Sequence, residues 1–359
     1  MLIDNALKAF AVNNDATELV KLIPVLKRNG DDDLQTALLL MKLFESSYPD
    51  AQAELGDCYS SGWGLIEDEQ KALSLYQSAA SSGNTTSKFF LGWYYYEREE
   101  YLQAIDNFAY CLAHSNDLDD KRLEDSYVCI GDAYSKISEP KITTAIENLA
   151  IAVDRYHNSF ACRRLAALYS ETNTPYFNAE KTIKYYELGA SYGDDVSAHR
   201  IGMAYLYGDD DLKITSNGRK ALSVLQPFED SDNVDILADL GALYQFGDED
   251  NGVARDPDKA RLYYERAYAQ IPDPYVASNL GYMYVCLGDF VNAEKMLLVA
   301  DQADYCGYSD FLGRIYNEGS TGVRDVNKAE YYYGRAYQEK QFNNIFTCDE
   351  YAEIGRAHV

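Results

Sequence analysis

Eight copies of one short pattern constrain the fold of this chain more than any other feature of its sequence. Each copy has an aliphatic residue, a glycine, two variable residues and a tyrosine, and only the fourth copy replaces the glycine with alanine. These small residues lie 32 to 40 positions apart, and they are Gly56, Gly92, Gly131, Ala166, Gly202, Gly241, Gly281 and Gly313. Self-similarity at a period of about 20–50 residues indicates a repeat array, so we number the repeats one to eight in chain order.

A second pattern follows each copy of the first and predicts a second helix. An alanine is followed four positions later by an aromatic residue or leucine, and three positions after that by a small residue. The clear copies are Ala72/Tyr76/Ala79, Ala145/Leu149/Ala152, Ala260/Tyr264/Ala267, Ala293/Leu297/Ala300 and Ala329/Tyr333/Ala336. This spacing defines one face of an α-helix. Each repeat is therefore expected to be a first helix (helix A), a loop and a second helix (helix B).

The repeated residues have physical roles in such a pair. A glycine inside helix A costs about 1 kcal/mol of helix propensity relative to alanine, so its recurrence implies that helix B approaches closely there. The repeat tyrosine is expected to fill the groove between helices, with its hydroxyl reaching solvent or a loop carbonyl. Tyr95 and Tyr333 are both expected in the core. On helix B, the small residues are expected to receive the next helix A.

The loops before helix B carry a finer signature in repeats one, six and eight. A glycine-containing loop leads to Asp68, Asp256 or Asp325, and each of these aspartates precedes a lysine–alanine pair. An aspartate there is a good N-cap because its carboxylate accepts hydrogen bonds from the free N–H groups of the first turn. Pro257 follows its cap directly, at the favoured first helical position.

At these residues the sequence resembles the Sel1-like repeat family, which is related to tetratricopeptide repeats. The resemblance covers roughly residues 50–340. The variable spacing and the Gly-Val loops favour the Sel1-like type over the stricter tetratricopeptide repeat of about 34 residues. Repeats two, three and seven lack the long loop and are more similar to tetratricopeptide repeats. The resemblance implies adaptor or scaffold work, often in the assembly of complexes or in bacterial signalling.

The predicted fold is all-α: a right-handed superhelical α-solenoid of about eight helix–loop–helix repeats with an N-terminal helical cap. We expect residues 1–49 to form the cap and residues 50–347 to form the repeats. Residues 348–359 are either the start of a truncated ninth repeat or a non-native tail. The second interpretation arises because the last seven residues resemble the translation of a common sequencing adapter.

The charge of the chain limits the classes of partner. With 58 acidic and 32 basic residues, the formal net charge is -26, so the average surface repels phosphate groups and anionic membranes. We therefore expect no nucleic acid and no membrane as partners. A basic protein or peptide would be attracted at long range. The alternative interpretation is that the acidity only keeps a long exposed surface soluble.

The cysteines and the N-terminus indicate a cytoplasmic protein. The seven cysteines include no CxxC pair, and most lie in predicted helices among apolar neighbours, as expected for reduced thiols. The N-terminus has no basic region followed by an apolar stretch, and the longest apolar run, residues 37–41, is far too short to span a bilayer. We expect a soluble cytoplasmic monomer.

The sequence contains no catalytic motif. None of the four histidines has the spacing of a metal site, and neither a nucleophile motif nor a phosphate-binding loop is present. The acidic segments 209–211 and 248–252 lack the register of an EF-hand, which favours solvated loops over calcium sites. We therefore predict no catalytic residue, no metal and no cofactor, and the protein is not expected to be an enzyme.

A partner is expected on the concave inner wall, which helix A supplies in tetratricopeptide-like solenoids. Its exposed positions are three before, one after and four after the repeat glycine. Candidate partner-binding residues at this spacing are Phe89, Trp93, Tyr96, Arg163, His199, Met203, Tyr282 and Arg314. The alternative is that Phe89 and Trp93 only pack against neighbouring helices.

Three functions remain open at this point. The first is a non-enzymatic scaffold that binds a protein or peptide partner. The second is a self-associating structural array driven by open solenoid ends. The third is a Sel1-like hydrolase, which would resemble a secreted array stapled by paired cysteines, a pattern that this sequence does not have.

Overall fold

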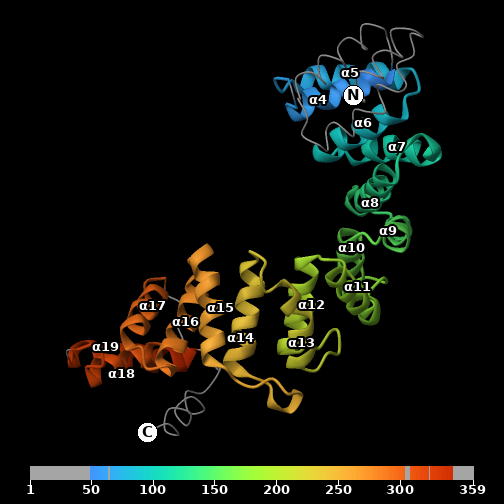
Figure 1. Cartoon of the computed structure of the whole chain (residues 1–359). Helices are drawn as coiled ribbons and strands as arrows, with labels where there is room; N and C mark the ends of the chain where they lie inside the picture. The colour runs from blue at the N-terminus through green and yellow to red at the C-terminus, as the bar shows by residue number, and fades with distance from the viewer. Residues whose placement is uncertain (1–48, 64, 304–307, 323, 343–359) are drawn as a thin grey trace, which may run out of the picture. The chain divides into compact units, whose positions relative to one another are not determined.

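The computed structural model describes residues 49–63, 65–303, 308–322 and 324–342. Within these ranges the chain is a succession of α-helices (Figure 1) with short 3-10 turns and no β-strand beyond two isolated bridges. The helices are α4 (Pro49–Ser61), α5 (Glu69–Ser81), α6 (Thr85–Glu97), α7 (Tyr101–Ala113), α8 (Asp120–Lys136), α9 (Ile142–Tyr156), α10 (Ser159–Ser170), α11 (Ala179–Ser191), α12 (Asp195–Tyr207), α13 (Gly218–Leu225), α14 (Val234–Phe246), α15 (Pro257–Gln270), α16 (Pro274–Cys286), α17 (Phe290–Gln302), α18 (Ser309–Glu318) and α19 (Val326–Phe342).

The predictions for the two ends of the chain cannot be compared with the structure. The N-terminal cap and the segment 348–359 lie outside the described residues, so the predicted domain boundaries stay predictions. Within the described ranges, no helix combines the length and the apolar character that crossing a membrane requires.

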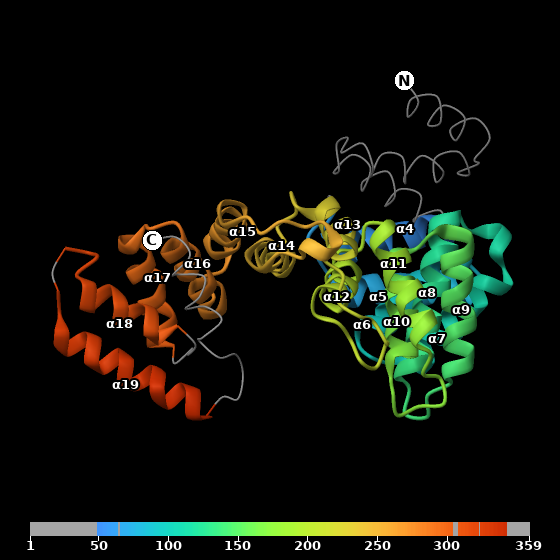
Figure 2. The same ribbon diagram turned by 90° about the horizontal axis from the view of Figure 1, so that it is seen from below.

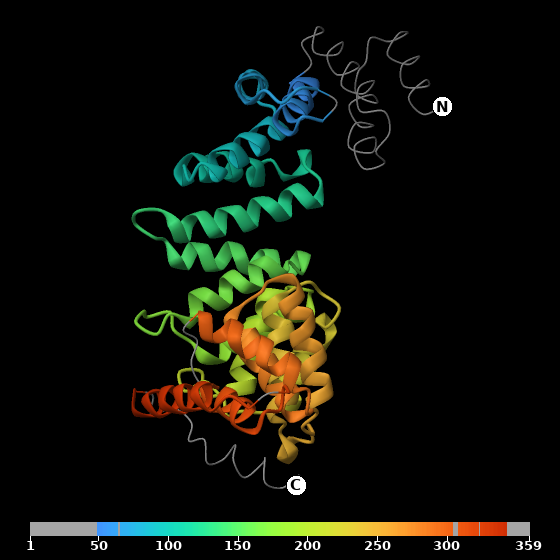
Figure 3. The same cartoon turned by 90° about the vertical axis from the view of Figure 1, so that its left-hand side faces the viewer.

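The described helices form two compact units, unit 1 up to Leu168 and unit 2 from Tyr169, and α10 crosses the boundary between them. In unit 1, α4 packs on α5, α6 on α7 and α8 on α9; Figure 3 shows these pairs as successive layers. In unit 2, α12 packs on α13, α14 on α15, α16 on α17 and α18 on α19; the last pair runs side by side in Figure 2. The predicted all-α fold of paired helices is confirmed.

The repeat glycines are the points where helix B comes closest to helix A. A Cβ atom built on any of the seven would lie 2.5 to 2.8 Å from a ring or leucine side chain of its own helix B. Gly92 faces Phe108, Gly202 faces Leu225 and Gly241 faces Tyr264. Side-chain carbons do not approach this closely, so the predicted steric role of the glycine is confirmed.

One backbone hydrogen bond anchors helix B to helix A in every repeat. The N–H group four positions before the first residue of the helix B pattern, an alanine in seven repeats and Thr182 in repeat four, donates to the carbonyl oxygen of the repeat tyrosine, with N–O distances of 2.6 to 2.9 Å. Glu100 reaches Tyr95 after five positions of chain, and Asn217 reaches Tyr205 after twelve. Because the anchor is constant, loops of different length are accommodated between helix A and helix B. In repeat two the loop is short, and the long spacing to repeat three arises from the connection between α7 and α8 instead.

The predicted N-caps of helix B are confirmed. The carboxylates of Asp68, Asp256 and Asp325 each accept a hydrogen bond at 3.0 Å from the backbone N–H three residues later. Pro257 occupies the first turn of α15, as predicted. These bonds satisfy N–H groups that have no partner within the helix.

The surroundings of the repeat tyrosine differ from the prediction in one respect. In three repeats its hydroxyl donates to a glutamate of the preceding helix B: Tyr205 to Glu187 at 2.5 Å, Tyr284 to Glu265 at 2.7 Å and Tyr316 to Glu294 at 2.6 Å. In these repeats the acceptor is a carboxylate, which is stronger than the expected solvent or loop carbonyl. A lysine at the start of the same repeat's helix B also covers the ring in six repeats; that of Lys71 lies 4.3 Å from the ring centroid of Tyr59.

One expectation about burial is wrong, and one holds with an exception. Tyr333 faces Gly313 but is 39% exposed, because no described helix follows α19 to cover it; its neighbour Tyr332 is buried and stacks on Tyr316. Cys286 at the end of α16 is exposed, whereas the other cysteines of the described ranges are buried.

Candidate partner-binding surface

Unit 1 contains a pocket of about 320 Å³ between helices of the first three repeats. Its walls combine aromatic rings with acidic side chains. The lining residues are Asp57, Ser60, Glu69, Tyr76, Phe89, Phe90, Trp93, Tyr94, Glu97, Arg98 and Asp125. Most of them come from α4, α6 and α8, the A helices of these repeats, and two come from α5.

The aromatic walls are held in place by ring contacts. Phe90 stacks on Tyr76 with ring centroids 5.1 Å apart, while Phe89 meets Phe108 edge-on at 5.9 Å. Trp93 also packs edge-on against Phe108, at 6.1 Å, and remains half-buried. A tryptophan fixed on one side and open on the other is suited to contact a partner with little loss of side-chain entropy.

One cation of the pocket lining already lies against an aromatic ring. The guanidinium carbon of Arg98, the residue that ends α6, lies 3.7 Å from the ring centroid of Tyr94. Its Nη1 donates to the carbonyl oxygen of Tyr94 at 3.0 Å, and it forms an ion pair with Glu69. Arg98 is the lining's only basic residue, beside four carboxylates.

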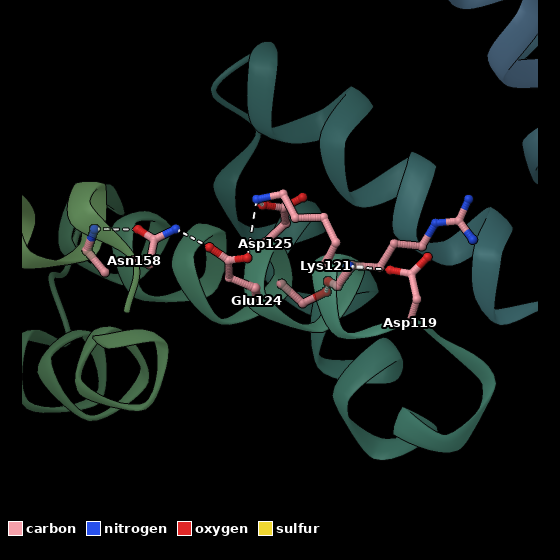
Figure 4. Close-up of polar contacts among 8 residues, drawn as sticks. Asp119, Lys121, Glu124, Asp125 and Asn158 are labelled. Atoms are coloured by element: carbon pink, nitrogen blue, oxygen red, sulfur yellow. Dashed lines mark hydrogen bonds and ion pairs between the residues drawn. The ribbon is translucent and has the colours of Figure 1, made fainter. Parts of the chain in front are cut away.

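The acidic wall on α8 belongs to a polar network (Figure 4). Lys121 Nζ lies 3.0 Å from a carboxylate oxygen of Asp125 and 3.3 Å from one of Glu124, which accepts from Asn158 Nδ2 at 2.6 Å. Burial raises the pKa of Asp125, and the nearby Lys121 opposes this effect. Because Asn158 is also hydrogen-bonded to the first turn of α10, the network ties repeat three to the start of repeat four.

The candidate residues of unit 1 have different environments. Phe89 is only 6% exposed, so the expectation of an exposed ring is wrong there: Phe90 and Phe108 cover it. Phe89 and Trp93 nevertheless meet at the pocket. Tyr96 contacts Trp93 and donates its hydroxyl to buried Asp132, and burial raises its pKa.

Arg163, the fourth candidate of unit 1, lies on α10. Its guanidinium carbon is 5.0 Å from the ring centroid of Phe160 on the same helix, and it is not part of the pocket lining. The structure therefore brings together three of the four candidates of this unit.

In unit 2, two candidates share the surface of α12. His199 Nδ1 lies 2.8 Å from Oδ2 of Asp239 on α14, and this hydrogen bond raises the pKa of His199. Met203, one turn further along α12, is 38% exposed.

The other two candidates of unit 2 lie on other helices, Tyr282 on α16 and Arg314 on α18. Tyr282 is 3% exposed because Tyr308 and Phe311 of the following repeat cover it, so the expectation of an exposed ring is wrong there too. Arg314 is exposed on α18 and lies 3.6 Å from Glu318 of the same helix.

Two lining residues of repeat one were not predicted, although the spacing from the repeat glycine applies to them. The positions one and four after Gly56 are Asp57 and Ser60, and both line the pocket. Arg98 had no such signal, because it belongs to the turn after helix A. In unit 2, the position five after the repeat glycine carries the exposed rings of Tyr207 and Phe246.

Comparison with known proteins agrees with this architecture. The Sel1 repeat matches five segments of the chain, residues 49–84, 159–194, 196–223, 237–270 and 311–340. The chain is a Sel1-repeat protein. The segments of this Sel1-repeat protein that are not matched contain repeats two, three and seven, the ones that lack the long loop. Folds of the Sel1 and tetratricopeptide type are typically protein-interaction scaffolds.

Several solved structures are similar to this Sel1-repeat protein. A protective antigen with an SLR fold from uropathogenic Escherichia coli is 19% identical, with a TM-score of 0.49 over 94% of this chain and 79% of the antigen. A Sel1 repeat protein from Oxalobacter formigenes is 17% identical, with a TM-score of 0.40 over 89% of this chain and 99% of the other. A tetratricopeptide repeat protein from Parabacteroides merdae is 13% identical, with a TM-score of 0.36 over 79% and 97%. Comparison with curated proteins gave no match.

Proposed function

We propose that this protein is a non-catalytic scaffold that binds a protein or peptide partner, and that the pocket of unit 1 is a point of contact. The observation that carries the proposal is the half-buried ring of Trp93 at a pocket built by three successive repeats. Aromatic side chains at concave sites dominate the energetics of protein interfaces. A location in the cytoplasm, where buried thiols such as Cys111 and Cys129 remain reduced, is part of the proposal.

The proposal is tested by selecting binders for the full chain from a displayed peptide library and measuring their affinity by calorimetry. Trp93→Ala is expected to weaken binding by about 2 kcal/mol or more, which is roughly 30-fold in the dissociation constant, because the ring supplies the central apolar contact. Leu102→Ala is the matched control, since Leu102 is an exposed apolar residue on α7 of the same unit and lies outside the pocket lining.

Both variants must retain the helical circular dichroism spectrum of the parent. If no selected peptide distinguishes Trp93→Ala from Leu102→Ala, the pocket is not the contact point. Light scattering of the unliganded chain tests the alternative, a self-associating array. A mass that grows with concentration, and no peptide binder, would favour that alternative.

A further inference from the structure

The pocket of unit 1 already holds a guanidinium group that belongs to the protein itself. Arg98 lies on the ring of Tyr94, with 3.7 Å between guanidinium carbon and ring centroid. It also pairs with Glu69 and donates to the carbonyl oxygen of Tyr94. The aromatic ring stacks on the plane of the guanidinium, and the carboxylate and the carbonyl oxygen accept hydrogen bonds from its N–H groups.

The same chemistry recurs next to the pocket. Arg122 Nη2 donates to Glu54 at 2.9 Å, and its guanidinium carbon lies 5.5 Å from the ring centroid of Phe90, which lines the pocket. Two guanidinium groups from different repeats thus use an aromatic ring and a carboxylate in this region. The combination therefore occurs twice in this part of unit 1.

The lining keeps an excess of negative charge after Arg98 is counted. Asp57, Glu69, Glu97 and Asp125 contribute four carboxylates against one guanidinium. Lys121 pairs with Asp125 from outside the lining. Charge complementarity therefore favours a cationic occupant, in the same direction as the net charge of -26 of the whole chain.

We propose that the pocket is a receptor for an arginine side chain of the partner, and that Arg98 fills part of it in the free protein as an internal competitor. This inference rests on the proposed function and specifies the chemistry of the partner. Arginine is favoured over lysine because a planar guanidinium stacks on a ring and forks onto a carboxylate, whereas an ammonium is a compact and strongly hydrated charge. When the partner binds, its arginine replaces Arg98 on Tyr94 and Glu69.

The pocket can be observed directly because the chain has only two tryptophans, Trp63 and Trp93. Labelling with 5-fluorotryptophan gives two fluorine signals, which the Trp63→Phe variant assigns. The probes are N-acetyl-arginine amide, N-acetyl-lysine amide and N-acetyl-citrulline amide; citrulline has the shape of arginine without its charge. The arginine probe is expected to shift the Trp93 signal saturably, the lysine probe more weakly, and the citrulline probe not at all. An equal response to citrulline, or no response to arginine, overturns the proposal.

Substitutions at Arg98 test its part as a competitor. The probe can bind only those molecules in which Arg98 has left the site, so its apparent affinity is reduced by the fraction of molecules that are open. Arg98→Gln opens the site in all molecules and should tighten binding of the arginine probe by roughly threefold or more. Arg98→Lys keeps the charge but removes the planar group, and it should also tighten binding. A gain for Arg98→Gln without one for Arg98→Lys would mean a general charge effect and would overturn the competitor role. Arg261→Gln, which breaks a surface ion pair on α15, is the matched control and should change nothing.

Failure of this inference can be told apart from failure of the proposed function. Peptides whose binding depends on Trp93 but not on an arginine would leave the scaffold proposal intact and refute the arginine receptor. Conversely, the probe titration reports on the pocket even when no peptide binder is found.

Discussion

Gly241→Ala adds one methyl group and should show whether overpacking against helix B outweighs the gain in helix propensity. Gly241 lies on α14, and a Cβ atom there would be 2.8 Å from Cε1 of Tyr264 on α15. Carbon atoms in contact prefer about 3.5–4.0 Å, so the ring or the helix has to move by roughly 1 Å. Tyr264 is fully buried, and its hydroxyl donates to Gln245 at 2.9 Å, so the ring cannot move without disturbing its own hydrogen bond.

The magnitude follows from two opposing contributions. Replacing glycine by alanine in a helix stabilises by about 1 kcal/mol, whereas overpacking a core costs about 1–3 kcal/mol. Gly334 on α19 supplies the matched control, because a Cβ atom there meets nothing within 4 Å. Gly334→Ala should therefore stabilise by up to about 1 kcal/mol. Since helix propensity contributes to both variants, the difference between them should be the overpacking cost, about 1–3 kcal/mol. Gly241→Leu should lie at or above the upper end.

Urea unfolding followed by circular dichroism gives the difference in free energy between the two variants. Long repeat arrays can unfold in parts, so hydrogen exchange should locate the damage. Protection is expected to fall in α14 and α15 before it falls in α8 and α9. If Gly241→Ala stabilises as much as Gly334→Ala, close approach at the repeat glycine is not a constraint. Equal loss of protection in all helices would instead contradict the local character of the repeats.

Three further predictions concern single side chains. Tyr95→Ala should lower stability rather than affinity, the reverse of the Trp93 variant, because its ring packs in the clusters of repeats one and two; urea midpoints measure this. Lys259→Met keeps most of the length of the side chain but removes the charge that lies 4.8 Å from the ring centroid of Tyr244. It should lower the free energy of unfolding by about 0.5–1 kcal/mol in the same assay, and no loss would mean that the contact is incidental. The pKa of His199 is raised above 6.5 by its hydrogen bond to Asp239. The stabilisation from this bond is therefore complete below about pH 6.5 and is lost as the pH rises through the raised pKa. His199→Gln should therefore reduce stability more at pH 5.5 than at pH 8, and an equal reduction at both would refute this assignment.

Much of the fold could be predicted because each repeat encodes its own helix pair. The glycine of helix A and the ring or leucine of helix B meet within one unit of about 40 residues, and the cap that begins helix B lies between them. Seven glycines facing seven bulky side chains, and the aspartate caps of α5, α15 and α19, are consequences of local spacing. Steric exclusion and N-cap hydrogen bonds act over short stretches of chain, so a sequence pattern can reveal them.

The candidate site was predicted less completely, because exposure on helix A depends on the neighbouring repeats. Trp93 and Tyr282 occupy the same position after their glycines, yet Trp93 borders a pocket and Tyr282 is covered by Tyr308 and Phe311. The covering rings come from the next repeat, at positions whose size the pattern does not specify.

The sequence by itself therefore determined the helices and their pairing within each repeat. Only the tertiary structure decided which positions of helix A are open, and it placed Arg98 from a turn against Tyr94 and Glu69. The physical reason is that pairing within a repeat is set by steric contacts encoded locally. A pocket, in contrast, is the space left between side chains of repeats more than 30 residues apart, and its shape and charge emerge only when those repeats are packed together.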